Sequence, residues 1–213
     1  MTAIGVFVAT RWESAAVCQA FAASEMRVVG GIRCAVARQG QVEWWVIPMG
    51  VGPERATTTA GRVLGEQSFA AVWSTGFACA LGQAVIGEVL IGTHVTMEGG
   101  AEDGRSVPCA AAGADWVRQA VQQQRLPVQA GQFVSVPRVL CRAEDKQEIA
   151  TRAGGVGLDM ESAAVKPSRA EWDRSPSWSG VVVAAWTDCS ATVGPPESAP
   201  TSGATSDATG AVV

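Results

Sequence analysis

The stretch AAVWSTGFACALG, residues 70–82, combines a buried strand with a point where a ligand could approach the backbone. Residues 70–75 are mostly apolar and suited to a strand. The strand is expected to end at Ser74-Thr75-Gly76, and Gly76 with the small residues after it would let a sugar or a flat ligand come close to the backbone. The same residues also fit a tight packing turn.

Strand-like and helix-like segments alternate on both sides of this stretch. Strands are predicted at residues 3–9, 26–29, 32–37, 41–48, 85–96, 129–136 and 155–158, and helices at residues 12–23, from Pro53 onward, and at 111–124 and 143–152. Most of the predicted strands are apolar on both faces, which is typical of a buried sheet. The sequence therefore predicts a single-domain α/β fold, with helices flanking a central, mostly buried, mixed sheet.

The composition is that of a soluble globular protein. The chain has 213 residues, of which 47% are hydrophobic and 17% charged, with a net charge of −4. Its 16 basic residues are scattered, which argues against nucleic acid and anionic membrane surfaces as partners. No apolar run approaches the roughly 20 residues of a membrane span. The N-terminus MTAIGVFVATRWE lacks the basic region of a signal peptide, so we expect a cytoplasmic location.

The metal-binding residue types are few and dispersed. Six cysteines are spread along the chain without a CxxC pair, and His94 is the single histidine. This pattern favours free thiols in a reducing compartment and argues against a zinc site. His94, alone on a predicted strand, is expected to be structural. We expect neither a metal nor an organic cofactor.

Acidic residues follow two predicted strands, at positions where α/β sheets bind ligands. Glu13 follows the first strand, and Asp159 and Glu161 follow the strand at residues 155–158. Each of these carboxylates also fits the start of a helix, where negative charge is favoured. A third segment, residues 75–79, is expected at the same edge of the sheet. Residues 50–53 form a glycine turn ahead of a helix, but they lack the lysine of a P-loop and the third glycine of a dinucleotide fingerprint.

Four segments, in this order, resemble the purine nucleoside phosphorylase and methylthioadenosine/S-adenosylhomocysteine nucleosidase superfamily. They are IGVFVATRWE (4–13), MGVGPERA (49–56), STGFACALGQAVIGEVLIG (74–92) and GLDMESAAV (157–165). They are similar to the family's first strand with its closing acid, its G-x-G turn, its (S/T)-G-x-A-G-x-L segment and its (D/E)-M-E-(S/G/A)-A signature. The resemblance runs from Ile4 to about Val165.

The resemblance implies roles for individual residues. Glu13 matches the nucleosidase glutamate that activates the attacking water, Glu161 the glutamate that holds the ribose hydroxyls, and Met160 the methionine that packs against the sugar. These residue types suit the chemistry, because breaking a ribosyl C–N bond passes through an oxocarbenium-like state that carboxylates stabilise.

The resemblance also implies where the base binds. Phe77 and Ala78 match positions beside the sugar and the base. Val139 and Leu140 fall where the family wraps the purine, often with an aromatic residue, and that aromatic is missing here.

The sequence departs from the family pattern after Val165. In the family an aspartate of a Ser-Asp pair protonates the departing purine, and here Asp188 in SGVVVAAWTDC (179–189) is the counterpart, on a possible strand. The family's arginine and closing helix have no counterpart. We therefore divide the chain into a nucleosidase-like domain (1–165), an aberrant or divergent continuation (166–190) and a disordered Ser/Thr/Ala/Pro/Gly-rich tail (191–213). A frameshift near residue 165 and genuine divergence both explain this change in composition.

The leading functional expectation is a purine nucleosidase that releases adenine from nucleosides or thionucleosides with water. One alternative is a phosphate-dependent nucleoside phosphorylase, including the hopanoid-associated type, in which Arg11 or Arg55 would meet phosphate. The other is an inactive remnant with a frameshifted C-terminus. The resemblance further implies a homo-oligomer.

Overall fold

The computed structural model describes residues 1–82, 84–98, 106–165 and 181–189, the last range by its backbone. Its strands are β1 (Thr2–Val8), β2 (Glu25–Val29), β3 (Ile32–Gln39), β4 (Val42–Pro48), β5 (Ala71–Ala80), β6 (Val89–Met97), β7 (Val107–Pro108), β8 (Val128–Ser135), β9 (Gly157–Asp159) and β10 (Val181–Cys189). Its helices are α1 (Arg11–Ala20), α2 (Pro53–Glu66), α3 (Ala111–Gln123), α4 (Ala143–Ala153) and the short 3-10 helix η1 (Ser162–Val165). The predicted single-domain α/β fold with a mixed central sheet is confirmed.

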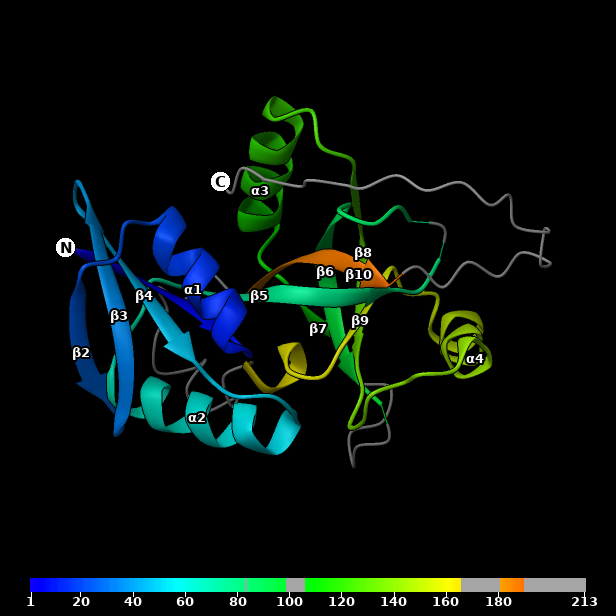
Figure 1. Cartoon of the computed structure of the whole chain (residues 1–213), viewed down its shortest axis with the longest axis horizontal. Helices are drawn as coiled ribbons and strands as arrows, with labels where there is room; N and C mark the ends of the chain where they lie inside the picture. The colour runs from blue at the N-terminus through cyan, green and yellow to red at the C-terminus, as the bar shows by residue number, and fades with distance from the viewer. Residues whose placement is uncertain (83, 99–105, 166–180, 190–213) are drawn as a thin grey trace, which may run out of the picture.

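The described strands form one sheet with an open half and a closed half. The order is β10-β6-β8-β9-β5-β1-β4-β3-β2, with β7 beside β6. An additional pairing between β10 and β5 closes the strands β10, β6, β8, β9 and β5 into a ring. Strand β5 belongs to both halves, because it also pairs in parallel with β1. Figure 1 shows β5 running across the centre of the molecule between them.

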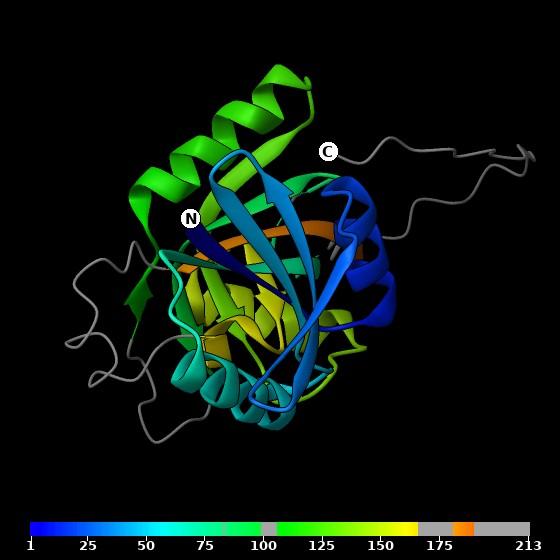
Figure 2. The ribbon, with the colours of Figure 1, turned by 90° about the vertical axis from the view of Figure 1, so that its left-hand side faces the viewer.

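Helices α1 and α2 cover opposite faces of the open half (Figures 1 and 2). Alternate residues of β1 and β4 point to opposite faces, as the period of a strand requires. Phe7 and Ile47 pack with Ala60 of α2, whereas Val6 and Val46 belong to the cluster that contacts α1. Both faces are therefore buried, which explains why the central residues of these strands are apolar on both faces.

Helices α3 and α4 cover parts of the closed half. Val117 of α3 packs with Val89 and Ile91 of β6. Ile149 of α4 packs with Val136, just after β8, and with Leu158 of β9. No helix in the described part of the chain is long and apolar enough to cross a membrane.

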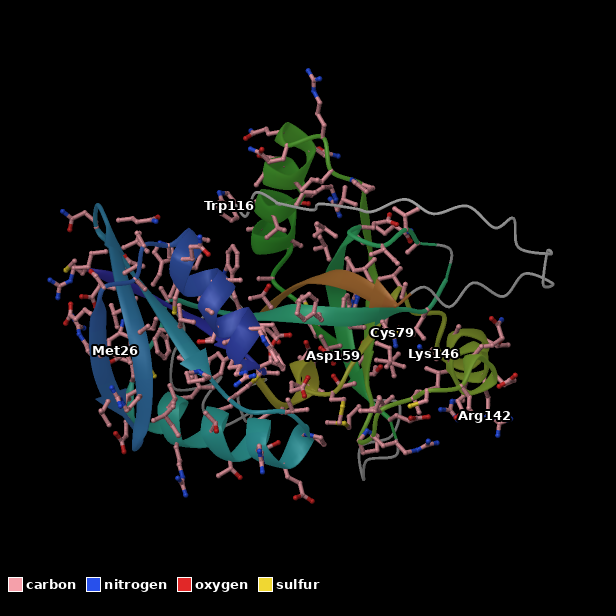
Figure 3. The ribbon with its side chains drawn as sticks, viewed as in Figure 1. Met26, Cys79, Trp116, Arg142, Lys146 and Asp159 are labelled. Atoms are coloured by element: carbon pink, nitrogen blue, oxygen red, sulfur yellow. The ribbon has the colours of Figure 1, made fainter. Side chains whose placement is uncertain are left out.

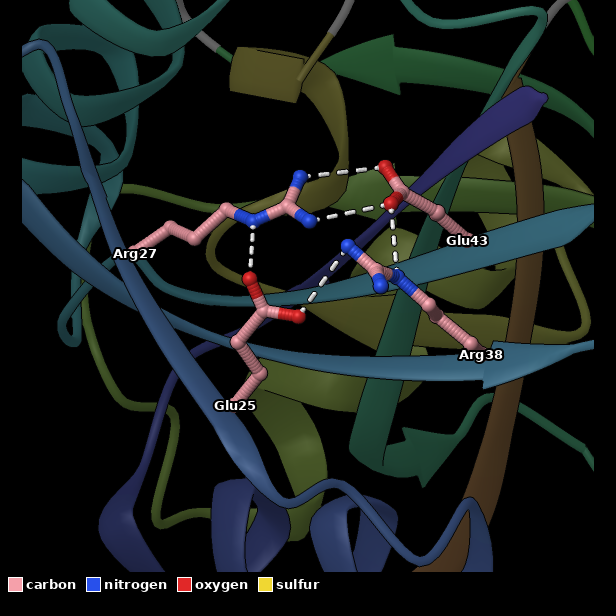
Figure 4. Close-up of polar contacts among 4 residues, drawn as sticks. All are labelled: Glu25, Arg27, Arg38 and Glu43. Atoms are coloured by element: carbon pink, nitrogen blue, oxygen red, sulfur yellow. Dashed lines mark hydrogen bonds and ion pairs between the residues drawn. The ribbon is translucent and has the colours of Figure 1, made fainter.

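The β2–β4 edge carries a ring of ion pairs, drawn in Figure 4. Glu43 accepts two hydrogen bonds from Arg27, at 3.0 and 3.1 Å, and one from Arg38, at 3.0 Å. Glu25 contacts the same two arginines. These interactions lower the pKa of Glu43, mainly through its hydrogen bond with Arg27. The four residues link three strands at the edge of the sheet.

The main difference from the sequence prediction is in β5. The strand was expected to end near Gly76, but it continues to Ala80. It continues because both of its neighbours supply partners beyond Gly76: Cys79 pairs with Leu158 of β9, and residues 77–79 pair with β10. The strand end predicted at Ser74-Thr75-Gly76 is therefore wrong, as is the alternative of a tight packing turn, because these residues lie within a strand.

Three other boundaries also differ from the prediction. The strand predicted at 85–96 begins at Val89, because Gly87 has φ +88° in a turn closed by a Glu88 N–H to Val85 carbonyl hydrogen bond. The helix predicted to continue to residue 23 ends at Ala20. The strand predicted at 155–158 spans 157–159, so Asp159 belongs to β9.

The continuation after Val165 is described only in part. The possible strand in residues 179–189 is confirmed as β10. The proposed tail, residues 191–213, and most of the proposed continuation, residues 166–190, lie outside the described residues.

Candidate functional site

A pocket lies where the end of β1, the middle of β5 and the end of β9 meet. It encloses about 270 Å³ of empty space, part of it open to solvent. Its lining residues are Ala9, Glu13, Met49, Ser74, Thr75, Gly76, Phe77, Asp159, Glu161 and Ser162. The three segments that the sequence predicted to meet at one edge of the sheet all contribute to it. A space of this size suits part of a small ligand, such as a sugar ring.

Glu13 is held in the pocket by the start of α1. The helix begins with a capping box, in which the Glu13 N–H donates to Thr10 Oγ1 and the Glu13 carboxylate accepts from the Thr10 N–H at 2.6 Å. The same Oε2 atom accepts from Ala9 N–H at 3.0 Å, and Oε1 accepts from Phe77 N–H at 2.8 Å. These three N–H groups fix the orientation of the carboxylate. Glu13 is also buried, with 8% of its surface exposed.

Gly76 is what lets β5 approach Glu13. A Cβ atom on residue 76 would overlap Oε1 of Glu13 and would lie 2.7 Å from its carboxyl carbon. No side chain fits between the strand and the carboxylate. The absence of a side chain at Gly76 is therefore required for the contact between β5 and Glu13, and the residue lies in a strand rather than in a turn.

Glu161 enters the pocket from the turn between β9 and η1. Its Oε1 accepts a 2.7 Å hydrogen bond from Gly52 N–H, at the start of α2, and its Oε2 accepts from Met160 N–H at 3.3 Å. Burial raises the pKa of Glu161 to about 7, and the charges of Asp159 and Glu13 act in the same direction. The Gly52 and Met160 N–H groups oppose this shift by stabilising the charged form.

Asp159 is the third carboxylate in the pocket. Figure 3 places it near the centre of the molecule beside η1, whereas Met26 and Trp116 lie at the periphery. Its Oδ1 accepts a 2.5 Å hydrogen bond from Ser135 Oγ, at the end of β8, and its two oxygens lie 3.3 and 3.2 Å from Ser162 N. Burial raises the pKa of Asp159, and these hydrogen bonds partly offset the increase.

Serine hydroxyls connect this acidic turn to the sheet. Ser135 Oγ accepts from Ala163 N–H at 2.9 Å, and Ser162 Oγ lies 3.1 Å from Ser74 Oγ of β5. All three serines are buried. Sequence reasoning missed Ser135 and Ser162, because a lone serine in an apolar run carries no functional signal without its partner.

The predicted base-binding residues lie outside this pocket, with the exception of Phe77. Phe77 lines the pocket and is 54% exposed. Ala78 is 3% exposed and packs in the core between Phe133 and Ala163, because neighbouring residues of a strand face opposite sides. Val139 is 67% exposed, and Leu140 is buried in the cluster near α4.

Met160 lies between Asp159 and Glu161 in the chain, and Asp188 belongs to β10, which pairs with β5. Met160 packs partly against the apolar cluster near α4, and its Cε lies 4.0 Å from where a Cβ on Gly52 would lie. Asp188 falls on β10, where the β10–β5 register shifts between Thr187 and Cys189. Its backbone therefore neighbours the part of β5 that follows Phe77, and its side chain lies outside the described residues.

The described residues include no group of three or more His, Cys, Asp or Glu side chains arranged to hold a metal ion. Among the described residues, no disulfide joins Cys18, Cys34, Cys79, Cys109 or Cys141. Burial raises the pKa of both Cys34 and Cys109 to about 11, so these thiols remain protonated at neutral pH. The chemistry available in the described pocket is that of carboxylates and hydroxyls.

The sequence profile of the phosphorylase superfamily matches residues 3–166. The chain belongs to this superfamily, an assignment that agrees with its fold and with the resemblance seen in its four motifs. It is accordingly an enzyme of the N-glycosyl hydrolase and pentosyltransferase class. No curated protein sequence matches the chain.

Several solved structures share the fold. A futalosine hydrolase mutant from Helicobacter pylori has a TM-score of 0.75 at 15% identity, over 88% of this chain and 89% of that one. A 5′-methylthioadenosine/S-adenosylhomocysteine nucleosidase from Campylobacter jejuni has a TM-score of 0.75 at 14% identity, over 93% and 90%. A mutant nucleosidase from Helicobacter pylori, with 5′-methylthioadenosine in its active site, has a TM-score of 0.76 at 16% identity, over 88% and 85%.

Proposed function

We propose that this protein is a purine nucleosidase, which cleaves the N-ribosidic bond of an adenine nucleoside or thionucleoside with water. The observation that carries the proposal is the meeting of Glu13 and Glu161 in one pocket. The two carboxylates come from positions far apart in the sequence, and each is oriented by backbone N–H groups of another segment. Such fixed carboxylates suit a reaction that develops positive charge on a sugar.

The proposed reaction assigns one task to each carboxylate. Glu161 accepts hydrogen bonds from the ribose hydroxyls and stabilises the oxocarbenium-like state as the C1′–N9 bond breaks. Glu13 takes a proton from water, whose oxygen forms the new bond to C1′. The electron pair of the broken bond goes to the purine, which takes up a proton. We assign that proton transfer to Asp188, by the resemblance.

Water is preferred to phosphate as the acceptor because of the charge of the pocket. Its described lining has three carboxylates and no basic side chain, so a phosphate anion would be repelled. The two arginines considered for a phosphorylase do not line it. The Arg11 guanidinium lies 4.6 Å from the centre of the Trp12 ring, and the Arg55 side chain lies beside Gly50.

The named neighbours support a nucleoside as the substrate and suggest which compounds to test. Two of them are 5′-methylthioadenosine/S-adenosylhomocysteine nucleosidases, and one is a futalosine hydrolase. The proposal extends their substrate class to this chain, in the role of a purine-salvage enzyme. The identity of the 5′ substituent is to be decided by experiment.

The test is chromatographic detection of free base from methylthioadenosine, S-adenosylhomocysteine, futalosine, adenosine and inosine, each with and without phosphate. We expect release of base without phosphate from at least one of these compounds, and loss of this release in Glu161→Gln. Release that requires phosphate would replace the nucleosidase with a phosphorylase. No release by folded protein would favour the inactive remnant.

A further inference from the structure

Asp159 has no role in the reaction as proposed, although it is a buried carboxylate that accepts hydrogen bonds from Ser135 and Ser162. It lies two residues before Glu161, at the end of β9, and lines the same space. Its partners belong to two other elements: Ser135 of β8 donates from its hydroxyl, and Ser162 of η1 donates from its N–H. Both oxygens of Asp159 contact groups of the protein. We therefore do not assign Asp159 a direct contact with the substrate.

The contacts of Asp159 fix the turn that carries Glu161. Ser135 Oγ bridges this turn, because it donates to Asp159 and accepts from Ala163 N–H. The Ser74–Ser162 hydroxyl contact ties the far side of the turn to β5. Glu161 thus lies between two anchored residues, Asp159 and Ser162, and its own carboxylate is held by Gly52 N–H.

We infer that Asp159 is a positioning residue for Glu161: it holds the 159–163 turn through Ser135 and adds a second carboxylate to the pocket that Glu161 enters. The inference rests on the proposed role of Glu161 as the ribose ligand. It agrees with the raised pKa of Glu161, to which the charge of Asp159 contributes after burial. The other titratable group of the described lining is Glu13, whose charge acts in the same direction with a smaller effect.

The test is the titration of the Glu161 carboxyl carbon by NMR, with its signal assigned by its loss in Glu161→Gln. In the wild-type chain the midpoint is expected near pH 7. Asp159→Asn keeps an oxygen acceptor for Ser135 and removes the charge, so the midpoint should fall by roughly 0.5–2 pH units. Asp115→Asn, which removes an exposed carboxylate on α3, is the matched control and should leave the midpoint unchanged.

Ser135→Ala provides a second route if Asp159→Asn does not fold. Without the hydroxyl, Asp159 loses a hydrogen bond that favours its charged form, so it is neutral over more of the pH range and the Glu161 midpoint should again fall. The loosened turn should also raise KM for the nucleoside roughly tenfold, the value of one typical hydrogen bond. A Glu161 midpoint that matches the wild type in every folded variant of Asp159 and Ser135 would overturn the inference.

The titration needs no turnover, so its outcome is separate from that of the proposed function. If base is released but the Glu161 midpoint is the same in the variants as in the wild type, the nucleosidase proposal stands and the positioning role of Asp159 is rejected. A shifted midpoint without base release from any nucleoside would keep the coupling between Asp159 and Glu161 and reject the proposed reaction.

Discussion

The N–H of Gly52 donates a 2.7 Å hydrogen bond to Oε1 of Glu161, a residue 109 positions later in the chain. Gly52 has φ +98° and precedes Pro53, the first residue of α2. A helix N-terminus offers N–H groups that lack partners within the helix, and it favours negative charge. The glycine turn at residues 50–53, which lacks the P-loop and dinucleotide signatures, therefore holds a carboxylate of the protein itself.

Glu161→Gln should abolish turnover and leave the fold intact. The amide oxygen can still accept from Gly52 N–H, but it carries no charge for the ribose hydroxyls or the developing oxocarbenium ion. We expect kcat/KM to fall about 10²- to 10³-fold, as when one preorganised charge-stabilising group is lost. Steady-state kinetics with the best substrate measures this fall, and circular dichroism checks the fold. Wild-type rates in the variant would refute the role of Glu161.

The free energy of unfolding should depend on pH because the pKa of the buried Glu161 carboxyl is raised in the folded chain. The pKa of Glu161 is about 7 in the folded chain, above its ordinary value near 4.5, so the folded state binds more protons than the unfolded state between these values. The free energy of unfolding should therefore fall as pH rises from about 4.5 to about 7, by up to about 3 kcal/mol from this group. Glu161→Gln should be less sensitive to pH over this window in urea denaturation. An identical dependence in both proteins would contradict the raised pKa.

Activity should change with pH in the opposite sense to stability. Only the ionised carboxylate of Glu161 suits the ribose and the developing cation, so kcat/KM should decline as pH falls below about 7. A pH–rate profile of the wild-type chain measures this limb. A profile that stays flat down to pH 5 would show that no group with this pKa controls the reaction.

Glu13→Gln should stop hydrolysis, with a fall of about 10²- to 10⁴-fold for the loss of a general base. It should also cost stability, because the amide has one acceptor oxygen in place of two, so the hydrogen bonds from Ala9, Thr10 and Phe77 cannot all be kept. Thr10→Ala separates the two effects, since it removes the Oγ1 cap at a cost of about 1 kcal/mol and keeps the carboxylate. Hydrolysis that survives in Glu13→Gln would remove the assignment of the water-activating base.

Gly76→Ala should inactivate the enzyme without any change in a charged group. The added Cβ would overlap Oε1 of Glu13, so either the carboxylate or the strand has to move. The matched control is Gly65→Ala in α2, where a Cβ meets nothing within 4 Å and the helix should gain about 0.5–1 kcal/mol. Gly76→Ala should therefore lower both the melting temperature and base release, whereas Gly65→Ala should raise the melting temperature and leave base release unchanged. Full activity in Gly76→Ala would contradict the tight approach of β5 to Glu13.

Glu43→Gln should destabilise the β2–β4 edge. The amide cannot pair with both Arg27 and Arg38, so the melting temperature at pH 7 should fall by a few degrees. The pKa of Glu43 is lowered in the folded chain, so this carboxylate stabilises the fold at neutral pH and loses that effect as pH falls through its pKa. The difference from wild type should therefore shrink in acid, and a constant difference at every pH would contradict the ion-pair origin.

The fold class and two pocket carboxylates could be predicted because their signals are local. Strands that are apolar on both faces indicate a buried sheet, and the acids after the first and the ninth strand could be recognised from their neighbours in the chain. The end of β5 could not be predicted, because it depends on pairing with Leu158 and with β10. Ser135 acquires a role only when β8 and β9 lie side by side.

Local sequence is thus sufficient for the α/β pattern, the helix-start position of Glu13 and the acidic turn at Glu161. The folded chain adds the closure of β10 onto β5, the contact of Gly76 with Glu13, and the hydrogen bonds that join Asp159 to Ser135 and Ser162. The physical reason for this difference is the distance along the chain over which each interaction acts. Periodicity and helix capping act within a few residues, whereas burial and charge coupling depend on which distant segments the sheet brings together.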